Sequence, residues 1–293
     1  RATPAPSADD ATYRDRRDDL TKTVRALESP DEWWRADAQR RLVERADRAA
    51  VPLVETIAAQ ATRAESRTRA LWTLHGLHSL TTPTIAAALN DPHPGVREQA
   101  LHFAGELIAR GQVAQLLPAA IAATRDGDAR VRFCAALALA GSRDETVVPA
   151  LAALVVRDGE DRWTRAAVLS GIAGRMDAFL AALQREPAAK PAAIAAVMEH
   201  LGRVFGAGAS LDSCRQFLND RLSEKGERSS RVSAVLGLVE GFRGRSGAKT
   251  AAQTDTFAAV LGAEGRASAT ARDFLRFVAE RAGDSQALLG DRL

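Results

Sequence analysis

The feature that most constrains this chain is a polar turn followed by an apolar helix, repeated at nearly constant spacing. The clearest copy runs Asp126–Gly–Asp–Ala–Arg–Val–Arg132 and continues into the alanine- and leucine-rich stretch 133–140. Asp126 is a turn-forming residue, and we expect its carboxylate to cap the free N–H groups of the helix that follows. The same pattern occurs upstream from Asp91 to Arg97, where aspartate and arginine are again six residues apart.

Aligning the chain on the arginine of this pattern reveals a repeat of about 28 to 35 residues. The aligned arginines are Arg35, Arg69, Arg97, Arg132, Arg165 and Arg231, the last interval covering two periods. Such a period, with a helix on each side of a polar turn, is typical of an α-solenoid, in which each unit packs only on its neighbours. We therefore predict an all-α, right-handed solenoid of about seven to eight helix pairs.

Three segments are expected along the chain. Residues 1–17 contain two prolines and a run of charged residues, which predicts a linker or the edge of a preceding domain. Regular helix pairs are predicted over residues 18–175. The pattern loosens after this point, so residues 176–293 are predicted to form irregular pairs and a cap, as terminal repeats often do.

Composition excludes several classes of protein. The net charge is +3, and basic and acidic residues are interspersed, which argues against a nucleic-acid partner. Cys134 and Cys214 lie far apart in apolar helical stretches, so we expect two small apolar side chains and no disulfide or metal pair. No apolar run approaches the roughly 20 residues that a membrane span needs.

No motif in the sequence predicts catalysis or a cofactor. There is no Gly-x-Ser-x-Gly nucleophile motif and no Cys-x-x-Cys-His sequence for haem attachment. His75 and His78 are three residues apart on a predicted helix, but no third ligand stands at metal-binding spacing. We therefore predict no catalytic residue, no metal and no cofactor in this chain.

The tryptophans are the main candidates for a binding surface. Trp33 and Trp163 each precede an aligned arginine by two residues, which predicts that they lie on the same edge of the stack. An aromatic edge can receive a partner, or a flipped base in a nucleic-acid enzyme, while packing at the turn is the alternative. Trp34 and Trp72 are expected in the core.

A Val-Arg-x-x-Ala run after the aspartate-containing turn resembles HEAT repeats, particularly the short bacterial kind described in phycobilisome lyases. In that family, aspartates and arginines form a ladder through the stack. The resemblance implies ladder roles for Asp91, Arg97, Asp126 and Arg132. Position 159 is glycine and position 63 is arginine, so the ladder is expected to be incomplete.

A longer resemblance covers residues 10–140 and is carried by Trp34–Arg45, Ala49–Leu53, Arg69–Leu77 and Asp91–Arg97. These runs are similar to the HEAT segment of large membrane-bound dehydrogenase-like proteins of planctomycetes and their relatives. In those proteins a sugar-dehydrogenase-like propeller precedes the repeats and a c-type haem domain follows them. The resemblance implies these domains as partners and a periplasmic or exported location.

The preferred interpretation is a non-catalytic scaffold or protein-interaction module. One alternative is a HEAT-like DNA glycosylase or another nucleic-acid-binding enzyme, which needs a face of basic residues on the concave helices. A second alternative, a phycobilisome-lyase-like binder of a chromophore protein, rests on fold analogy.

Overall fold

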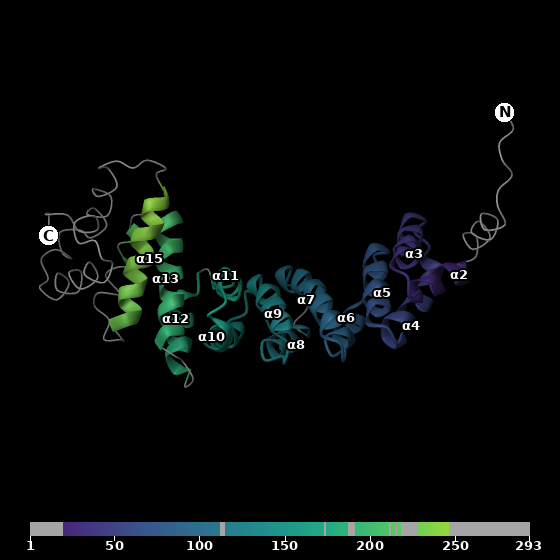
Figure 1. Ribbon diagram of the computed structural model, residues 1–293, viewed down its shortest axis with the longest axis horizontal. Helices are drawn as coiled ribbons and strands as arrows, with labels where there is room; N and C mark the ends of the chain where they lie inside the picture. Colours follow the sequence, from purple (N-terminus) through teal and green to yellow (C-terminus); the bar gives the residue numbers. More distant parts are fainter. Residues whose placement is uncertain are drawn as a thin grey trace, which may run out of the picture. The chain divides into compact units, whose positions relative to one another are not determined.

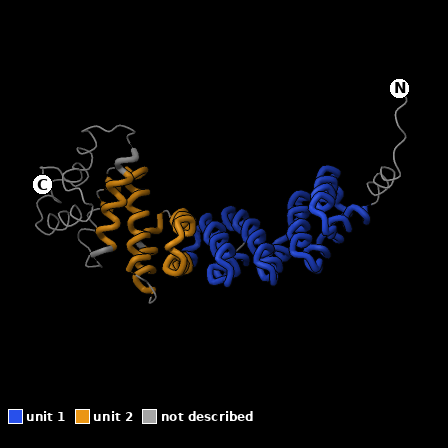
Figure 2. Tube along the Cα trace, viewed as in Figure 1, with its two compact units in different colours: residues 1–147 blue, residues 148–293 orange. Residues whose placement is uncertain are grey.

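The structure is a computed structural model of the chain. It describes residues 20–111, 115–172, 174–186, 191–210, 212–214, 216–217 and 228–245. The chain divides into two compact units, residues 1–147 and 148–293, which are coloured separately in Figure 2. The described residues contain helices and turns and no strand, so the all-α prediction is confirmed. The predicted linker 1–17 and everything predicted beyond residue 245 lie outside the described residues.

The first unit is a row of helix pairs (Figure 1). The pairs are α2 (Leu20–Arg25) and the 3-10 turn η1 (Ala26–Glu28) with α3 (Glu32–Glu44); η2 (Arg48–Ala50) and α4 (Val51–Gln60) with α5 (Ala64–Gly76); α6 (Thr82–Ala88) with α7 (Pro94–Ala109); and α8 (Leu117–Ala123) with α9 (Ala129–Ala140). We call the first member of each pair its first helix and the other its second helix. Successive second helices contact one another, from α3 through α5 and α7 to α9.

Two helices of the second unit have 18 residues each and are longer than any described helix of the first unit. The described elements of the second unit are α10 (Val147–Asp158), α11 (Arg162–Ser170), α12 (Met176–Arg185), α13 (Pro191–Gly208) and α15 (Arg228–Arg245). The sequence pattern predicts an interhelix turn at residues 206–210, but α13 continues as far as Gly208. Helices α13 and α15 lie side by side along much of their length (Figure 1).

The core between the helices is aliphatic, with small residues where second helices approach one another. Fully buried side chains include Leu27, Leu42, Leu71, Leu74, Leu101, Phe103 and Leu139. A Cβ atom at Gly105 on α7 would lie 2.9 Å from the Cα of Ala138 on α9. One at Gly141 would lie 2.7 Å from the Cβ of Ala109. Larger side chains at these positions would force α7 and α9 apart.

Short polar side chains fix the starts of the second helices. Asp31 caps α3, Asp128 caps α9 and Asp161 caps α11, each by accepting backbone N–H groups of the first helical turn. His93 takes this place before α7, where its Nδ1 accepts the N–H of Gly95 at 3.1 Å.

The prediction that Asp126 caps α9 is wrong. The cap is Asp128, two residues later, whose Oδ1 accepts the N–H groups of Arg130 and Val131 at 2.8 and 3.3 Å. The Oδ1 of Asp126 accepts the N–H of Asp128 at 2.8 Å, which closes the turn before the helix begins.

Five arginines at equivalent places in successive second helices bind the turn before their own helix. In each, one guanidinium nitrogen donates to the backbone carbonyls six and five residues earlier, at 2.5–3.2 Å; they are Arg35, Arg67, Arg97, Arg132 and Arg165. The alignment predicted Arg69 in place of Arg67. Arg69 lies two residues further on and donates to Gln39 and Glu32 of α3.

Two of these arginines also bind an aspartate of the following repeat. Arg67 donates from Nε and Nη2 to the two carboxylate oxygens of Asp91 at 2.6 and 2.7 Å, and Arg97 binds Asp126 in the same way at 2.8 Å. The four side chains are only 8–19% exposed. We call each such pair a rung. Each rung connects the turns of two consecutive repeats.

The aspartate of the rung is missing from the equivalent position on either side of these two rungs. The position equivalent to Asp91 and Asp126 is Ala61 in the repeat before them and Gly159 before α11. Without a carboxylate at Ala61, Arg35 donates from Nη2 to Glu32 on its own helix, at 2.6 Å. Its Nε is buried and has no hydrogen-bond partner within the described residues. The gap at Gly159 is where the sequence predicted it, whereas the other is at Ala61 and not at residue 63.

We expect a double-mutant cycle to detect the rung between Arg97 and Asp126. Asp126→Ala should destabilise the protein by about 2–4 kcal/mol, because it leaves a desolvated guanidinium without its carboxylate. The coupling free energy with Arg97→Ala, measured by denaturant unfolding, should exceed about 1 kcal/mol. Asp128→Ala is the matched control: it loses an N-cap at a cost of about 1 kcal/mol and should couple to Arg97 more weakly, because Asp128 acts on Arg97 through its charge alone. Equal coupling of both aspartates would contradict the rung.

The rungs should also make stability depend on pH. The hydrogen bond from Arg97 lowers the pKa of Asp126. Burial acts to raise the pKa of Asp91, but hydrogen bonds from Arg67 and from the N–H of His93 outweigh it and lower this pKa as well. A lowered folded-state pKa stabilises the protein above the ordinary carboxyl value of 3.8, and this stabilisation is lost as the pH falls through the folded-state value.

Below about pH 4, we therefore expect the urea midpoint of the wild type to fall more steeply with decreasing pH than that of an Asp91→Asn/Asp126→Asn double variant. Asparagine keeps the shape and a hydrogen-bond acceptor but cannot titrate. Parallel pH profiles would show that the two carboxylates do not contribute in this range.

Glycines bring α13 and α15 into backbone contact. A Cβ atom at Gly202 on α13 would overlap the carbonyl oxygen of Ala234 on α15, and one at Gly237 on α15 would overlap that of Glu199 on α13. Gly241 lies one turn beyond Gly237 and is equally close to α13. The absence of side chains at these positions allows the close approach.

We expect Gly202→Ala to destabilise the second unit by about 2–3 kcal/mol, because α13 and α15 must separate to admit a methyl group. Gly208→Ala on the same helix is the control, since a Cβ there meets nothing within 4 Å. It should be neutral or slightly stabilising. Denaturant unfolding of both variants tests the contact, and equal stability of the two would contradict it.

Candidate functional site

A polar pocket of about 490 Å³ opens across the second helices of the first unit. Its lining comes from α3, α5, α7 and α9, and includes Glu32, Glu65, Arg69, Trp72, Glu98 and Arg130. The four helices contact one another in series, so this surface is continuous through the row. Side chains of four consecutive repeats contribute to it.

The register of the second helices decides which residues face this pocket. Glu65, Gly95 and Arg130 stand two residues before the turn-binding arginine of α5, α7 and α9, and all three line the pocket. Trp33 holds the same position in α3. Its side chain is 56% exposed, and its ring makes an edge contact with that of Trp34 at a centroid distance of 4.7 Å. The register therefore places an exposed tryptophan in the same row as the pocket residues.

Trp163 holds the equivalent position in α11, in the second unit. It is 60% exposed, and the guanidinium carbon of Arg162 lies 4.6 Å from the centre of its ring. The sequence prediction that Trp163 and Trp33 share one edge relates two different units and stays a prediction.

The pocket was not predicted from the sequence, and Trp72 was expected in the core. Trp72 is half-buried and lines the pocket. Its Nε1 donates to the Oε1 of Gln99 at 3.0 Å, and its ring contacts that of Phe103 at a centroid distance of 4.7 Å. These contacts from α7 hold the indole in one orientation. The position five residues after the turn-binding arginine, which Trp72 holds in α5, is held in α9 by the exposed Leu137.

The two ion pairs that line the pocket differ in how firmly they are held. Glu32 receives hydrogen bonds from both Arg35 and Arg69, and Arg69 also donates to Gln39 at 2.6 Å. Glu98 lies 3.1 Å from Arg130, but the Glu98 side chain is 11% exposed while that of Arg130 is 81% exposed. The second pair thus combines a nearly desolvated carboxylate with a cation that is almost fully in water.

The pKa values of Cys134 on α9 and Glu65 on α5 are shifted by their surroundings. Burial, and after it the charge of Glu98, raises the pKa of the Cys134 thiol. A backbone hydrogen bond within Glu65, more than the nearby charge of Arg63, lowers the pKa of its exposed carboxyl. Glu65 is therefore anionic at neutral pH. Acidic and basic side chains alternate over the pocket, so it is not the basic face that the nucleic-acid alternative needs.

His75 and His78, three residues apart in the sequence, do not lie on one face of a helix. His78 lies beyond the end of α5 with a φ of 54°. The Nε2 atoms of His75 and His102 lie 3.7 and 3.4 Å from the carboxylate of Glu106. In the part of the chain that the structure describes, no group of three histidine, cysteine or acidic side chains is arranged to hold a metal ion.

Two further expectations concern the cysteines and the membrane. Cys134 and Cys214 are both free thiols, the first half-buried and the second buried. Among the described helices, none combines the length and apolarity needed to cross a bilayer.

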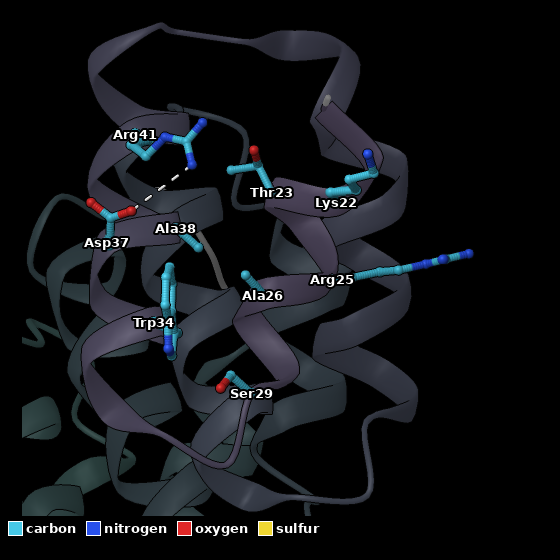
Figure 3. Close-up of a pocket in the computed structure, with 9 residues that line it drawn as sticks. All are labelled: Lys22, Thr23, Arg25, Ala26, Ser29, Trp34, Asp37, Ala38 and Arg41. Atoms are coloured by element: carbon cyan, nitrogen blue, oxygen red, sulfur yellow. Dashed lines mark ion pairs between the residues drawn. The ribbon is translucent and has the colours of Figure 1, made fainter. Parts of the chain in front are cut away.

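A second pocket, of about 380 Å³, lies between α2, η1 and α3. Figure 3 shows the Trp34 ring as one wall, with Asp37 and Arg41 above it at an N–O distance of 3.9 Å. The side chain of Arg25 extends away from the cavity (Figure 3). All the residues that line this pocket belong to one repeat.

Comparison with known proteins supports the helix-pair architecture. No curated protein matches the chain. A family model described as HEAT repeats matches residues 81–173, the stretch that contains α6 to α11 and the rung between Arg97 and Asp126. Residues 81–173 are therefore HEAT repeats.

Proposed function

We propose that the chain is a non-catalytic scaffold that holds a protein partner on the second helices of its first unit. The observation that carries this proposal is the pocket shared by α3, α5, α7 and α9, with Trp72 in its lining. HEAT repeats are generally non-catalytic protein-interaction modules, and this chain matches no catalytic family. Half-buried tryptophans that are already held in place bind partners with little loss of conformational entropy.

We further propose a larger, exported dehydrogenase-like haem protein as the parent, with an adjacent propeller or c-type haem domain as the partner. This step rests on the resemblance of Trp34–Arg45 and Arg69–Leu77 to the repeats of such proteins. Those two runs include most of α3 and α5, and they contain Arg69 and Trp72 of the pocket. The segment that resembles those proteins and the segment that lines the pocket thus overlap.

The other two functions are less well supported. A DNA glycosylase or other nucleic-acid enzyme requires a surface of basic residues along several helices, and the second helices present Glu65, Glu98 and Glu106 beside Arg69 and Arg130. Binding of a chromophore protein remains a matter of fold analogy, because no residue in the pocket favours it.

Site-specific photo-cross-linking in cells that produce the parent protein tests which face meets the partner. Leu137 on α9 and Leu53 on α4 are both exposed leucines, one on a second helix and the other on a first helix. We expect p-benzoylphenylalanine at residue 137 to give a discrete cross-linked product, and the same residue at position 53 to give none. Cross-linking only from position 53, or equally from both, would contradict the proposal.

A further inference from the structure

We propose that the pocket across α3, α5, α7 and α9 receives an arginine or lysine side chain of the partner polypeptide, with Glu98 as its anionic anchor. This inference rests on the proposed function, since it specifies the chemistry of the partner at the same surface.

Glu98 and Arg130 form an ion pair whose two members are unequally buried. A carboxylate that is 11% exposed has lost most of its hydration, so it depends on a nearby cation. The cation it has, Arg130, is 81% exposed and sits at 3.1 Å on a long, flexible side chain. Such an exposed partner contributes little, because hydration and side-chain entropy compete with the contact. A cation brought by a partner can therefore replace Arg130 and bind the desolvated carboxylate of Glu98.

The indole of Trp72 offers a second attraction for a cation. Its ring is fixed by Gln99 and Phe103, as described above, and it lines the same pocket as Glu98. A guanidinium or ammonium group is attracted to the face of an indole ring, and this attraction adds to that of a carboxylate. Glu65, on the same helix as Trp72, is a second carboxylate in the lining. A pocket that combines an aromatic ring with carboxylates is suited to a cationic side chain.

The three carboxylates of the lining differ in burial and in how their cations are held. Glu32 is 60% exposed and binds both Arg35 and Arg69, and Arg69 is also held by Gln39. Glu65 is 58% exposed and lies 3.9 Å from Arg63. Glu98 is the most buried of the three, and its cation, Arg130, is the most exposed. A cationic side chain of a partner therefore gains most at Glu98.

Peptide titration followed by the indole N–H resonance of Trp72 tests the inference directly. The probes are three 12-residue Gly/Ser peptides that carry three arginines, three glutamates or three leucines. The Trp72 resonance is assigned with Trp72→Phe, since the chain has four tryptophans. We expect only the arginine peptide to shift this resonance in a saturable way.

Three variants separate the anchor from general electrostatics. Glu98→Gln should weaken binding of the arginine peptide by about tenfold, as loss of one charge-assisted contact does. Arg130→Gln should tighten it, because the competing cation is removed. Glu106→Gln is the matched control: it removes the same charge from the same helix outside the pocket lining, and should leave affinity unchanged.

Preferential binding of the glutamate or leucine peptide would overturn the inference, as would equal effects of the changes at residues 98 and 106. Circular dichroism checks whether the Glu98→Gln variant folds. If it does not, the Arg130→Gln variant provides the test, and weaker binding of the arginine peptide to that variant would contradict the role of Glu98. These outcomes are independent of the scaffold function, since partner cross-linking from position 137 can persist while the arginine peptide fails to bind.

Discussion

The bidentate contact between an arginine of one repeat and an aspartate of the next is the interaction on which the first unit depends. A guanidinium group has five N–H donors in a fixed plane. In Arg67 and Arg97 these donors are shared between the turn of the same repeat and the carboxylate of the following one. Each aspartate in turn accepts an N–H of its own turn. Because every partner is fixed by its own repeat, the rung fixes the rotation of one helix pair relative to the next.

The pocket is a consequence of that fixed rotation. With the turn-binding arginines aligned, the same helical positions face the same side in α5, α7 and α9. Glycine and alanine at the contact between α7 and α9 bring these helices close enough for side chains of different repeats to share one cavity. Trp72 on α5 can therefore bind Gln99 on α7, and Glu98 on α7 can bind Arg130 on α9. A site built this way requires several repeats in register and is absent from any single pair.

The sequence predicts the helix pairs well because its period and its Asp–Arg spacing are local. The prediction is wrong where two nearby residues both fit the same role in a local pattern. Arg67 and Arg69 both open a helical run, and the choice between them depends on which one reaches the carbonyl of Ala61. Asp126 and Asp128 both suit a cap, and the helix takes the second because the first closes the turn and binds Arg97. The glycines in residues 206–210 predict a turn, but α13 continues to Gly208 and packs closely on α15 through Gly202 and Gly206. The half-exposure of Trp72 depends on neighbours 27 to 31 residues away.

The charge of the whole chain gives no guide to what this surface binds. The net charge is only +3, and acidic and basic residues are interspersed along the chain. Most of the described arginines of the first unit already bind carbonyls or carboxylates. What distinguishes one pair from another is how much water each partner keeps. Both carboxylate oxygens of Glu32 are already bound, one by Arg35 of the same helix and the other by Arg69 of α5. At Glu98 the carboxylate is desolvated and the cation is not, so the free energy gained by a better-placed cation is largest there. Selectivity in a mixed-charge surface can thus arise from unequal burial within a single pair.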